Sequence, residues 1–431
     1  MPSRSVHALP PARQERAALV GLLTRASSVI DPGQALDELA GLASAAGASV
    51  VLRLLQDRPK PDPATFLGRG KLETLRAACE ETEADVAIFD NELTPAQLRN
   101  LEEALGRKVL DRTQLILDIF ARRARTREGK LQVELAQLKY LLPRLVGSGT
   151  ALSRLGAGIG TRGPGETKLE TDRRRIRQRI SALGREIDRV RRRRSQLRER
   201  RHKAAVPTVT LVGYTNAGKT TLFNLLTGER AIASDALFVT LDPLVRRLLL
   251  PDRRQLLMSD TVGFIDRLPH SLVAAFRATL EEVAKSDLLI HVIDASSPDR
   301  DRHAAAVRAV LAEVGAEEVP AVEAFNKCDQ LDAAELARLR RAHPAALSVS
   351  ALRGEGHADL LDAVTSRLGL DTQRLTLAFD HDSEEDRQRI AAVYRHARVL
   401  SHLTTNGRVE IVADVPRRLI GRFELRQAVT T

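Results

Sequence analysis

Cysteines, aromatic residues and long apolar runs are all scarce in this chain of 431 residues. Its two cysteines, Cys79 and Cys328, cannot form a disulfide framework, which excludes the small secreted domains that disulfides stabilise. No uninterrupted apolar run approaches the roughly 18 residues that a membrane-spanning helix needs. Ala17–Leu23 follows Arg13 and Arg16 as a signal peptide's apolar region would, but it is short and lacks a small-residue cleavage site. We therefore expect a protein of the cytoplasm.

Length and charge indicate several folded domains and a polyanionic partner. At roughly 150 residues per domain the chain has room for about three, and its 29% charged and 43% hydrophobic residues exclude global disorder. The net charge is +11, and the stretch Asp172–Lys203 alone carries 15 basic against four acidic residues, which is the whole excess. This local excess predicts binding to nucleic acid or to an anionic membrane surface. A merely solvated helix face is the plain alternative.

The basic stretch also has helical periodicity. Apolar residues recur at steps of three, four or seven in it and in an upstream segment, as in heptad seams. The two seams are Leu131, Leu135, Leu138, Leu142 and Leu145, then Leu169, Ile176, Ile180, Leu183, Ile187, Val190 and Leu197. Between them, Gly147–Gly165 has seven glycines and cannot be helical throughout. The pattern predicts an antiparallel hairpin with arms of about 20 residues and a tip ~30 Å from its base. A flexible linker is the alternative.

The N-terminal part is predicted to be mixed α/β. Val86–Phe89 is a short apolar strand candidate, and Asp90 and Asn91 after it are interpreted as turn formers. In Thr94–Gln97 the threonine can cap a helix, Pro95 fills its first position and the glutamine closes a capping box. The pattern therefore predicts a helix that begins at Pro95.

A phosphate-binding loop follows the basic stretch. Gly213–Thr220 reads Gly-Tyr-Thr-Asn-Ala-Gly-Lys-Thr, the G-x-x-x-x-G-K-[ST] pattern, between a strand candidate at Thr208–Val212 and a helical segment. In that setting, backbone N–H groups and the helix N-terminus bind phosphates. Lys219 is expected to reach the β and γ phosphates, and Thr220 to ligate Mg²⁺.

Further motifs select guanine as the base. Asp260–Gly263 reads Asp-Thr-Val-Gly after a strand candidate, which provides a carboxylate for Mg²⁺ and an N–H group for the γ phosphate. Asn326–Asp329 reads Asn-Lys-Cys-Asp, and the Asp329 carboxylate can accept hydrogen bonds from guanine N1–H and the 2-amino group. Adenine has no such donor pair. Ser350–Leu352 follows an apolar run and can contact guanine O6. GTP, and not ATP, is the predicted ligand.

These motifs, in their order across residues 206–370, resemble the G domain of translation-factor-class GTPases. The resemblance implies that Thr240, within Leu237–Pro243, closes over Mg²⁺ and the γ phosphate. Phe264 stands where a Ras-like enzyme has a glutamine that orients water, so we expect slow basal hydrolysis with activation from outside. Asn216 resembles the asparagine of potassium-dependent GTPases, which makes K⁺ a candidate cofactor.

The predicted site combines these motifs. The catalytic candidates are Lys219, Asn216 and Gly263, and the Mg²⁺ ligands are Thr220, Thr240 and Asp260. The predicted nucleotide contacts are Gly213, Tyr214, Thr215, Asn216, Ala217, Gly218, Lys219, Thr220, Thr221, Val239, Thr240, Asp260, Thr261, Val262, Gly263, Asn326, Lys327, Asp329, Ser350, Ala351 and Leu352.

Three strings outside the G domain resemble those of the HflX family of ribosome-associated GTPases. They are Thr65–Leu72, Gly129–Tyr140 and Gly160–Asp172, within a match that covers about residues 15–370. Where the family pattern has two threonines after Leu241-Asp242-Pro243, this chain has Leu244 and Val245, so it lacks those hydroxyls. The resemblance implies a GTPase that converts GTP to GDP and phosphate, binds the large ribosomal subunit and splits or rescues stalled ribosomes. A GTP-gated rRNA-binding factor for large-subunit assembly is the alternative.

The resemblance and the composition together predict four units. They are an N-terminal α/β domain at 1–125, the basic helical hairpin with its glycine-rich tip at 126–203, the GTPase G domain at 204–370 and a small α/β domain at 371–431. The last is predicted as a strand at Leu375–Phe379, a helix at Glu384–Leu400 and a strand at Arg408–Val415, and nothing in it indicates chemistry.

The basic helix is expected to recognise phosphate and shape. Aromatic residues make up 3% of the chain and none lies within 172–203, so stacking on splayed bases is not expected there. Structured ribosomal RNA fits this pattern. We expect a monomer, with peripheral attachment to a membrane surface as the alternative role of the basic helix.

Overall fold

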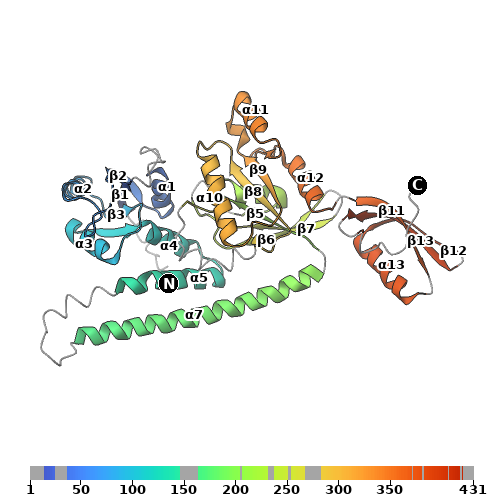
Figure 1. Cartoon of the computed structure of the whole chain (residues 1–431), viewed down its shortest axis with the longest axis horizontal. Helices are drawn as coiled ribbons and strands as arrows, with labels where there is room; N and C mark the ends of the chain where they lie inside the picture. Colours follow the sequence, from blue (N-terminus) through green and yellow to red (C-terminus); the bar gives the residue numbers. More distant parts are fainter. Residues whose placement is uncertain are drawn as a thin grey trace, which may run out of the picture.

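The first sheet follows from alternating apolar strands and amphipathic helices, an order in which strands pair in parallel with helices crossing between them. Its strands are β1 (Arg16–Leu23), β2 (Ser49–Asp57), β3 (Val86–Phe89) and β4 (Lys108–Asp111), all parallel, in the order β2-β1-β3-β4. Its helices are α1 (Asp37–Ala45), α2 (Arg69–Glu81), α3 (Pro95–Leu105) and α4 (Arg112–Arg123). Figure 1 shows this computed structural model. It describes residues 14–24, 36–145, 164–203, 206–231, 237–250, 254–266, 283–370, 372–380, 383–405, 407–417 and 420.

Strand β1 contains the apolar run that was compared above with a signal peptide. Its side chains alternate between two cores, as the pleat of a strand requires. Ala17 and Leu19 pack with residues of α1 and α4, and Ala18 and Val20 pack with residues of α2 and α3. Helices therefore cover both faces, which explains why β1 is apolar throughout.

The strand and helix predicted near residue 90 are confirmed. Thr94 Oγ1 accepts from Gln97 N at 3.2 Å, Gln97 Oε1 accepts from Thr94 N at 3.0 Å, and α3 begins at Pro95. Asp90 has a further role that the turn interpretation missed. It is buried and accepts a hydrogen bond from Arg112 Nη1 at 2.7 Å, so it neutralises a buried guanidinium.

Two helices follow the first sheet and pack on each other. They are α5 (Arg127–Arg144) and α7 (Pro164–Lys203), of 18 and 40 residues. Leu131 and Leu135 of α5 contact Leu183 and Ile187 of α7 in a small buried cluster. The buried part of the predicted seam therefore lies near the middle of α7, opposite the shorter helix α5. The predicted tip lies largely outside the described residues, since 146–163 are not among them.

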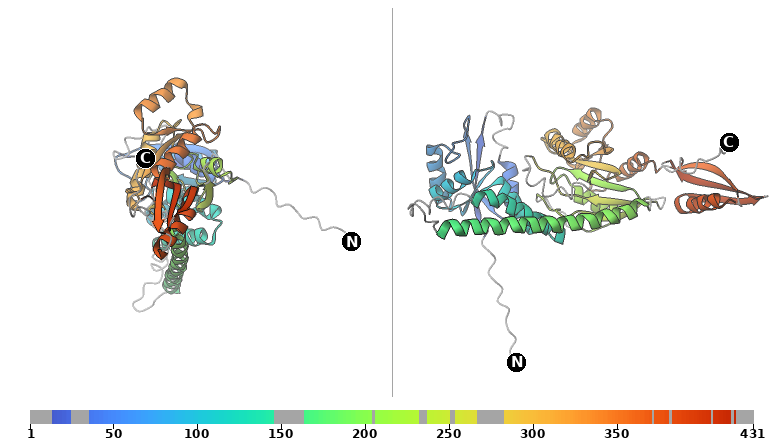
Figure 2. Two further views of the ribbon diagram at one scale, coloured as in Figure 1. Left: turned by 90° about the vertical axis from the view of Figure 1, so that its right-hand side faces the viewer. Right: turned by 60° about the horizontal axis from the view of Figure 1, so that its bottom comes forward.

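Helix α7 is twice as long as the predicted arm. At 1.5 Å per residue its 40 residues span ~60 Å. Figures 1 and 2 show it running beneath both the first sheet and the second. Among the described residues, no helix combines the length and apolar character needed to cross a membrane.

The second sheet has six strands in the order β10-β9-β8-β5-β7-β6, all parallel except the edge strand β6. The strands are β5 (Thr208–Gly213), β6 (Leu244–Leu249), β7 (Gln255–Asp260), β8 (Leu288–Asp294), β9 (Ala321–Asn326) and β10 (Leu347–Ser348). The helices are α8 (Lys219–Thr227), α10 (Arg300–Glu313), α11 (Ala333–Ala342) and α12 (His357–Arg367). The motifs named above follow β5, β7, β9 and β10, whose parallel ends share one edge of the sheet. That edge is where an open α/β sheet binds ligands.

The third sheet corrects the prediction for the C-terminal part. It contains β11 (Thr372–Asp380), β12 (Arg398–Thr405) and β13 (Arg408–Pro416), antiparallel in the order β11-β13-β12, beside α13 (Glu384–His396). The predicted helix to Leu400 was therefore too long, and β12 was missed. Most side chains of β12 are exposed, so it lacks the apolar alternation that marks a strand in sequence. The dipeptide Asn406-Gly407 is the signal that identifies this hairpin.

Candidate nucleotide site

The phosphate loop lies between the end of β5 and the first turn of α8, and close backbone approaches shape it. A Cβ on Gly213 would lie 2.2 Å from Val292 O, and one on Gly218, whose φ is +87°, would lie 2.2 Å from Asn326 Nδ2. Only glycine fits at either position. Asn216 also has a left-handed φ of +60°, which holds its exposed side chain at the mouth of the loop.

Lys219 lies inside the curl of this loop. Its Nζ donates to the backbone oxygens of Gly213 at 3.0 Å and Tyr214 at 2.7 Å, and the side chain is buried. Burial lowers the pKa of the ammonium to about 8, against the attraction of Asp260. An anion bound in the loop would stabilise the charged ammonium and raise its pKa again.

Three predicted metal ligands meet beside Lys219. Thr220 Oγ1 donates to Asp260 Oδ2 at 2.7 Å and lies 2.8 Å from Thr240 Oγ1, and Thr240 Oγ1 lies 3.3 Å from the same carboxylate oxygen. Burial raises the pKa of the Asp260 carboxyl. The other oxygen, Oδ1, is buried and has no hydrogen-bond partner among the described residues. A buried carboxylate oxygen beside two hydroxyls is a donor set that suits Mg²⁺.

The segment after Asp260 lies against the phosphate loop. A Cβ on Gly263 would lie 2.6 Å from Thr215 Cα and 3.1 Å from Lys219 Nζ, so the backbone there approaches the loop closely. Phe264 N donates to Gly213 O at 3.1 Å, and Thr215 N donates to Phe264 O at 2.6 Å. Gly263 is therefore held next to the ammonium. Thr261 and Val262 are buried, and Thr261 Oγ1 donates to Leu211 O.

The predicted guanine-binding segments are joined to each other and to the loop. Asn326 Nδ2 donates to Ala217 O, and Asn326 Oδ1 accepts from Ala351 N, both at 2.9 Å. Asp329 Oδ1 accepts from Ser350 Oγ at 2.6 Å, and the Asp329 side chain is 8% exposed. Lys327 pairs with Asp294 at 2.8 Å. The Ser350 hydroxyl thus holds one oxygen of the Asp329 carboxylate, the group predicted to accept the two guanine donors.

A cavity of about 310 Å³ joins most of these groups. Its lining comprises Thr215, Asn216, Gly218, Lys219, Thr220, Thr221, Phe238, Val239, Thr240, Thr261, Gly263, Lys327 and Leu352. Of these only Phe238 is absent from the prediction. The other predicted residues are not part of this lining, although Asp260 bonds to Thr220 and Thr240 within it.

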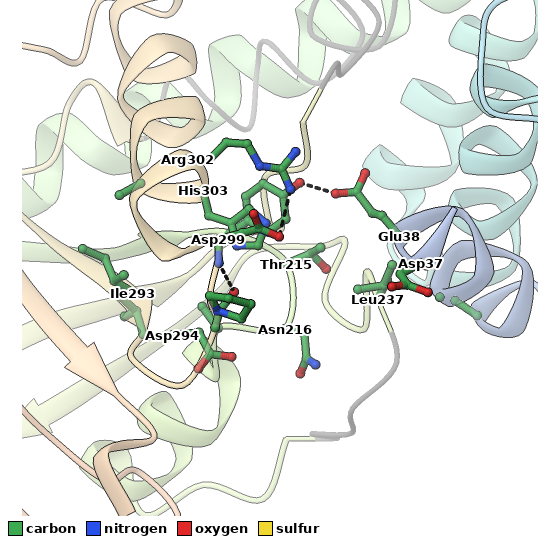
Figure 3. Close-up of a pocket in the computed structure, with 18 of the residues that line it drawn as sticks. Asp37, Glu38, Thr215, Asn216, Leu237, Ile293, Asp294, Asp299, Arg302 and His303 are labelled. Atoms are coloured by element: carbon green, nitrogen blue, oxygen red, sulfur yellow. Dashed lines mark hydrogen bonds and ion pairs between the residues drawn. The ribbon is translucent and has the colours of Figure 1, made fainter. Parts of the chain in front are cut away.

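A larger cavity of about 630 Å³ lies on the other side of Thr215 and Asn216, between α1 and the start of α10. Figure 3 shows Asp37 and Glu38 of α1 facing Asp299, Arg302 and His303 across it. No sequence motif indicates this wall, because its residues come from distant segments.

Tyr214, predicted as a nucleotide contact, points its side chain to this second cavity. Its hydroxyl donates to Glu38 and accepts from Asp266 N at 2.8 Å, and its ring stacks on His303 with 3.8 Å between centroids. Arg112 also contacts Glu38 and donates to Asp266 O at 3.1 Å. Tyr214 therefore joins the phosphate loop to the first sheet through its side chain.

Comparison with known proteins finds related GTPases along most of the chain. Residues 33–121 match the family described as GTP-binding GTPase N-terminal, 123–201 match GTP-binding GTPase Middle Region, and 208–327 match 50S ribosome-binding GTPase. The protein called GTPase HflX from Caldanaerobacter subterraneus subsp. tengcongensis is 48% identical over 86% of this chain and 85% of its own length. Its namesake in Alkalihalophilus pseudofirmus is 54% identical over 69% of this chain and 70% of its own length. The GTPase HflX of Escherichia coli K12 is 48% identical over 79% of this chain and 81% of its own length.

Proposed function

The chain belongs to the HflX family of GTPases, and we propose that it binds the large ribosomal subunit and uses bound GTP to split or rescue stalled ribosomes. It carries a P-loop GTPase domain, with GTP as the nucleotide it hydrolyses. Hydrolysis resets binding in this proposal. The single observation that carries it is the combination of this domain with a 40-residue helix whose residues 172–203 hold a net charge equal to that of the whole chain.

The contacts in the site support the following proposed roles at the nucleotide. The backbone N–H groups of the phosphate loop and Lys219 bind the phosphates, and Asp329 accepts the two guanine donors. Thr220, Thr240 and Asp260 would hold Mg²⁺, which when bound supplies positive charge at the β and γ phosphates. Gly263 offers its N–H to the γ phosphate, and Asn216 is the residue for K⁺.

The exposed face of α7 is proposed to bind rRNA phosphates. Arg174, Arg175, Arg177, Arg192 and Arg193 are all exposed. Arg179 differs, because Glu134 of α5 accepts from its Nε at 2.7 Å and so holds the two helices together. Arg175 and Arg177 also lie 3.8 and 4.0 Å from Asp172 and Glu170 of α7 itself. Contacts from several exposed guanidinium groups make binding steeply dependent on salt.

We further propose that α5 and α7 are the arms of a hairpin whose tip reaches a functional centre of the ribosome. The proposed units remain 1–125, 126–203, 204–370 and 371–431. The packing of Leu131 and Leu135 on Leu183 and Ile187 supports an antiparallel pair. Deleting 148–163 tests the tip, because electrostatic binding should persist while splitting is lost.

Sedimentation of ribosomes with GTP, GDP and a non-hydrolysable analogue tests the proposal. Conversion of intact ribosomes to subunits with GTP or the analogue, and not with GDP, is expected. Binding to free large subunits alone would favour the assembly factor instead. A separate GTPase assay with K⁺ exchanged for Na⁺ tests Asn216, and an unchanged hydrolysis rate would remove potassium from the proposal.

A charge reversal gives the matched control. Arg192→Glu with Arg193→Glu should weaken ribosome binding and flatten its salt dependence, while the free protein keeps its GTP affinity. Arg338→Glu with Arg341→Glu changes charge equally at exposed positions of α11, which lies away from α7 (Figure 1). If both pairs weaken binding equally, α7 is not the rRNA-binding face.

A further inference from the structure

The segment that carries Thr240 is fastened to the first sheet and its helices. Phe238 packs edge-on against Phe120 of α4, with 4.8 Å between ring centroids. Leu237 lies over Gly41 of α1, where a Cβ would come within 3.0 Å of Leu237 Cδ1. These two contacts are apolar and lie before Thr240 in the chain. The third contact, after Thr240, is polar and has a different partner.

Asp242 makes this third contact with the start of α5. Its Oδ2 accepts from Arg125 N at 2.8 Å and Thr126 N at 2.9 Å, and its Oδ1 accepts from the Thr126 hydroxyl. Thr126 is the N-cap of α5, and its Oγ1 in turn accepts from Gly129 N at 3.0 Å. The Asp242 carboxylate thus completes the cap of α5 from outside the helix, at the end where the helix dipole favours negative charge.

Gly129 provides an independent sign that this contact is built into the chain. It lies inside the first turns of α5, where glycine is less favourable than alanine. A Cβ on Gly129 would lie 2.3 Å from Asp242 Oδ1 but 3.3 Å from Thr126 Oγ1. The carboxylate of Asp242 is therefore the group that requires glycine at this position.

The contact between Asp242 and α5 lies between the predicted Mg²⁺ position and helix α7. On one side, Thr240 is two residues from Asp242, and its hydroxyl contacts Thr220 and Asp260 at the predicted γ-phosphate and Mg²⁺ position. On the other side, α5 packs against α7, which carries the exposed arginines. Two residues of chain span about 7 Å at most, so a larger displacement of Thr240 must move Asp242 and strain its contact with the first turn of α5.

We propose that Asp242 is a positioning residue that ties the Thr240 segment to the first turn of α5, so that the nucleotide state is transmitted to the α5 and α7 pair. This inference rests on the proposed function for its purpose, since α7 is the proposed ribosome-binding element. The coupling itself is a property of the free protein, so it can be tested without ribosomes. Loss of Asp242 should leave GDP bound and the fold intact while it uncouples α5 from the γ phosphate.

Hydrogen exchange of the free, full-length protein tests this coupling. In the wild type, the amides of residues 125–129 should exchange at different rates with GDP and with a non-hydrolysable GTP analogue. Asp242→Ala should abolish that difference, and the preference of the protein for the analogue over GDP should fall by about tenfold, as expected for a charged hydrogen bond. Thr126→Ser keeps both hydroxyl contacts and should behave as the wild type.

A double-mutant cycle separates the coupling from a general loss of structure. Gly129→Ala should disturb the same contact from the helix side, because its Cβ would displace the Asp242 carboxylate. In the Asp242→Ala background the collision is gone, so Gly129→Ala should cause no further loss. Additive effects, or an unchanged exchange difference in Asp242→Ala, would overturn the proposal. Failure of the wild type to split ribosomes would count against the proposed function and leave this measurement unaffected.

Discussion

The buried ammonium of Lys219 makes nucleotide affinity depend on pH. Its pKa is lowered to about 8 because burial removes the ammonium from water, an effect that the attraction of Asp260 only partly offsets. Bound phosphates would favour the charged form and raise this pKa. Binding therefore takes up a proton above pH 8, and the affinity for nucleotide should fall as the pH rises through that value.

The magnitude follows from the lowered pKa of Lys219. Each pH unit above the free-state pKa costs up to a tenfold loss of affinity, so about 30-fold is expected between pH 7 and pH 9.5. Dissociation constants of a fluorescent GDP at constant ionic strength measure it. Calorimetry in buffers of different ionisation enthalpy should show the accompanying proton uptake.

Lys219→Arg is the control for this prediction. A guanidinium stays charged throughout the range, so the variant should bind more weakly but with a dependence on pH that comes only from the nucleotide and other groups. Any ionisation of guanine itself is shared by both proteins. A wild-type profile as flat as that of Lys219→Arg would refute the assignment of a lowered pKa to Lys219.

Three other outcomes are expected. Asp329→Asn should weaken GTP by at least about 1 to 3 kcal/mol, because one guanine donor loses its acceptor, and should improve relative binding of xanthosine nucleotides; equal ATP and GTP affinity in the wild type would contradict this. Tyr214→Phe removes the hydroxyl that joins Glu38 to Asp266 and should lower the free energy of unfolding by about 1 to 3 kcal/mol, measured in urea. Burial lowers the pKa of His291 to about 4, so its stabilising contribution is present above pH 6.5 and is lost as the pH falls towards 4. Between pH 7.5 and 5 this loss is about 2 kcal/mol, and His291→Leu should remove it from the urea-unfolding profile.

Local patterns explain what the sequence could predict. The phosphate loop needs glycines at close approaches, a lysine and a threonine at fixed spacing, all within eight residues. The Thr94 and Gln97 cap is likewise complete within one helical turn. Each of these features is decided by neighbours in the chain, so its signal survives in a single sequence.

Contacts between distant segments had no such signal. Glu38 lies 176 positions from Tyr214, and Thr126 lies 116 from Asp242, so neither pair has a spacing that a motif could record. Gly129 shows the same limit from another side. Within a helical pattern, a glycine indicates only a position that disfavours the helix. The reason for a glycine at position 129 becomes visible only when Asp242 is placed beside it.

Phe264 shows how one residue can serve a chemical argument and a structural one. Its side chain is 2% exposed and belongs to the core shared by the first sheet, its helices and the loop after β7. Its backbone is meanwhile bonded to Gly213 and Thr215 on either side. The position that holds a water-orienting glutamine in Ras-like enzymes is thus occupied by packing between the G domain and the N-terminal part. The ring anchors that packing and offers no polar group that could orient an attacking water, which is the physical basis for expecting slow hydrolysis by the isolated protein.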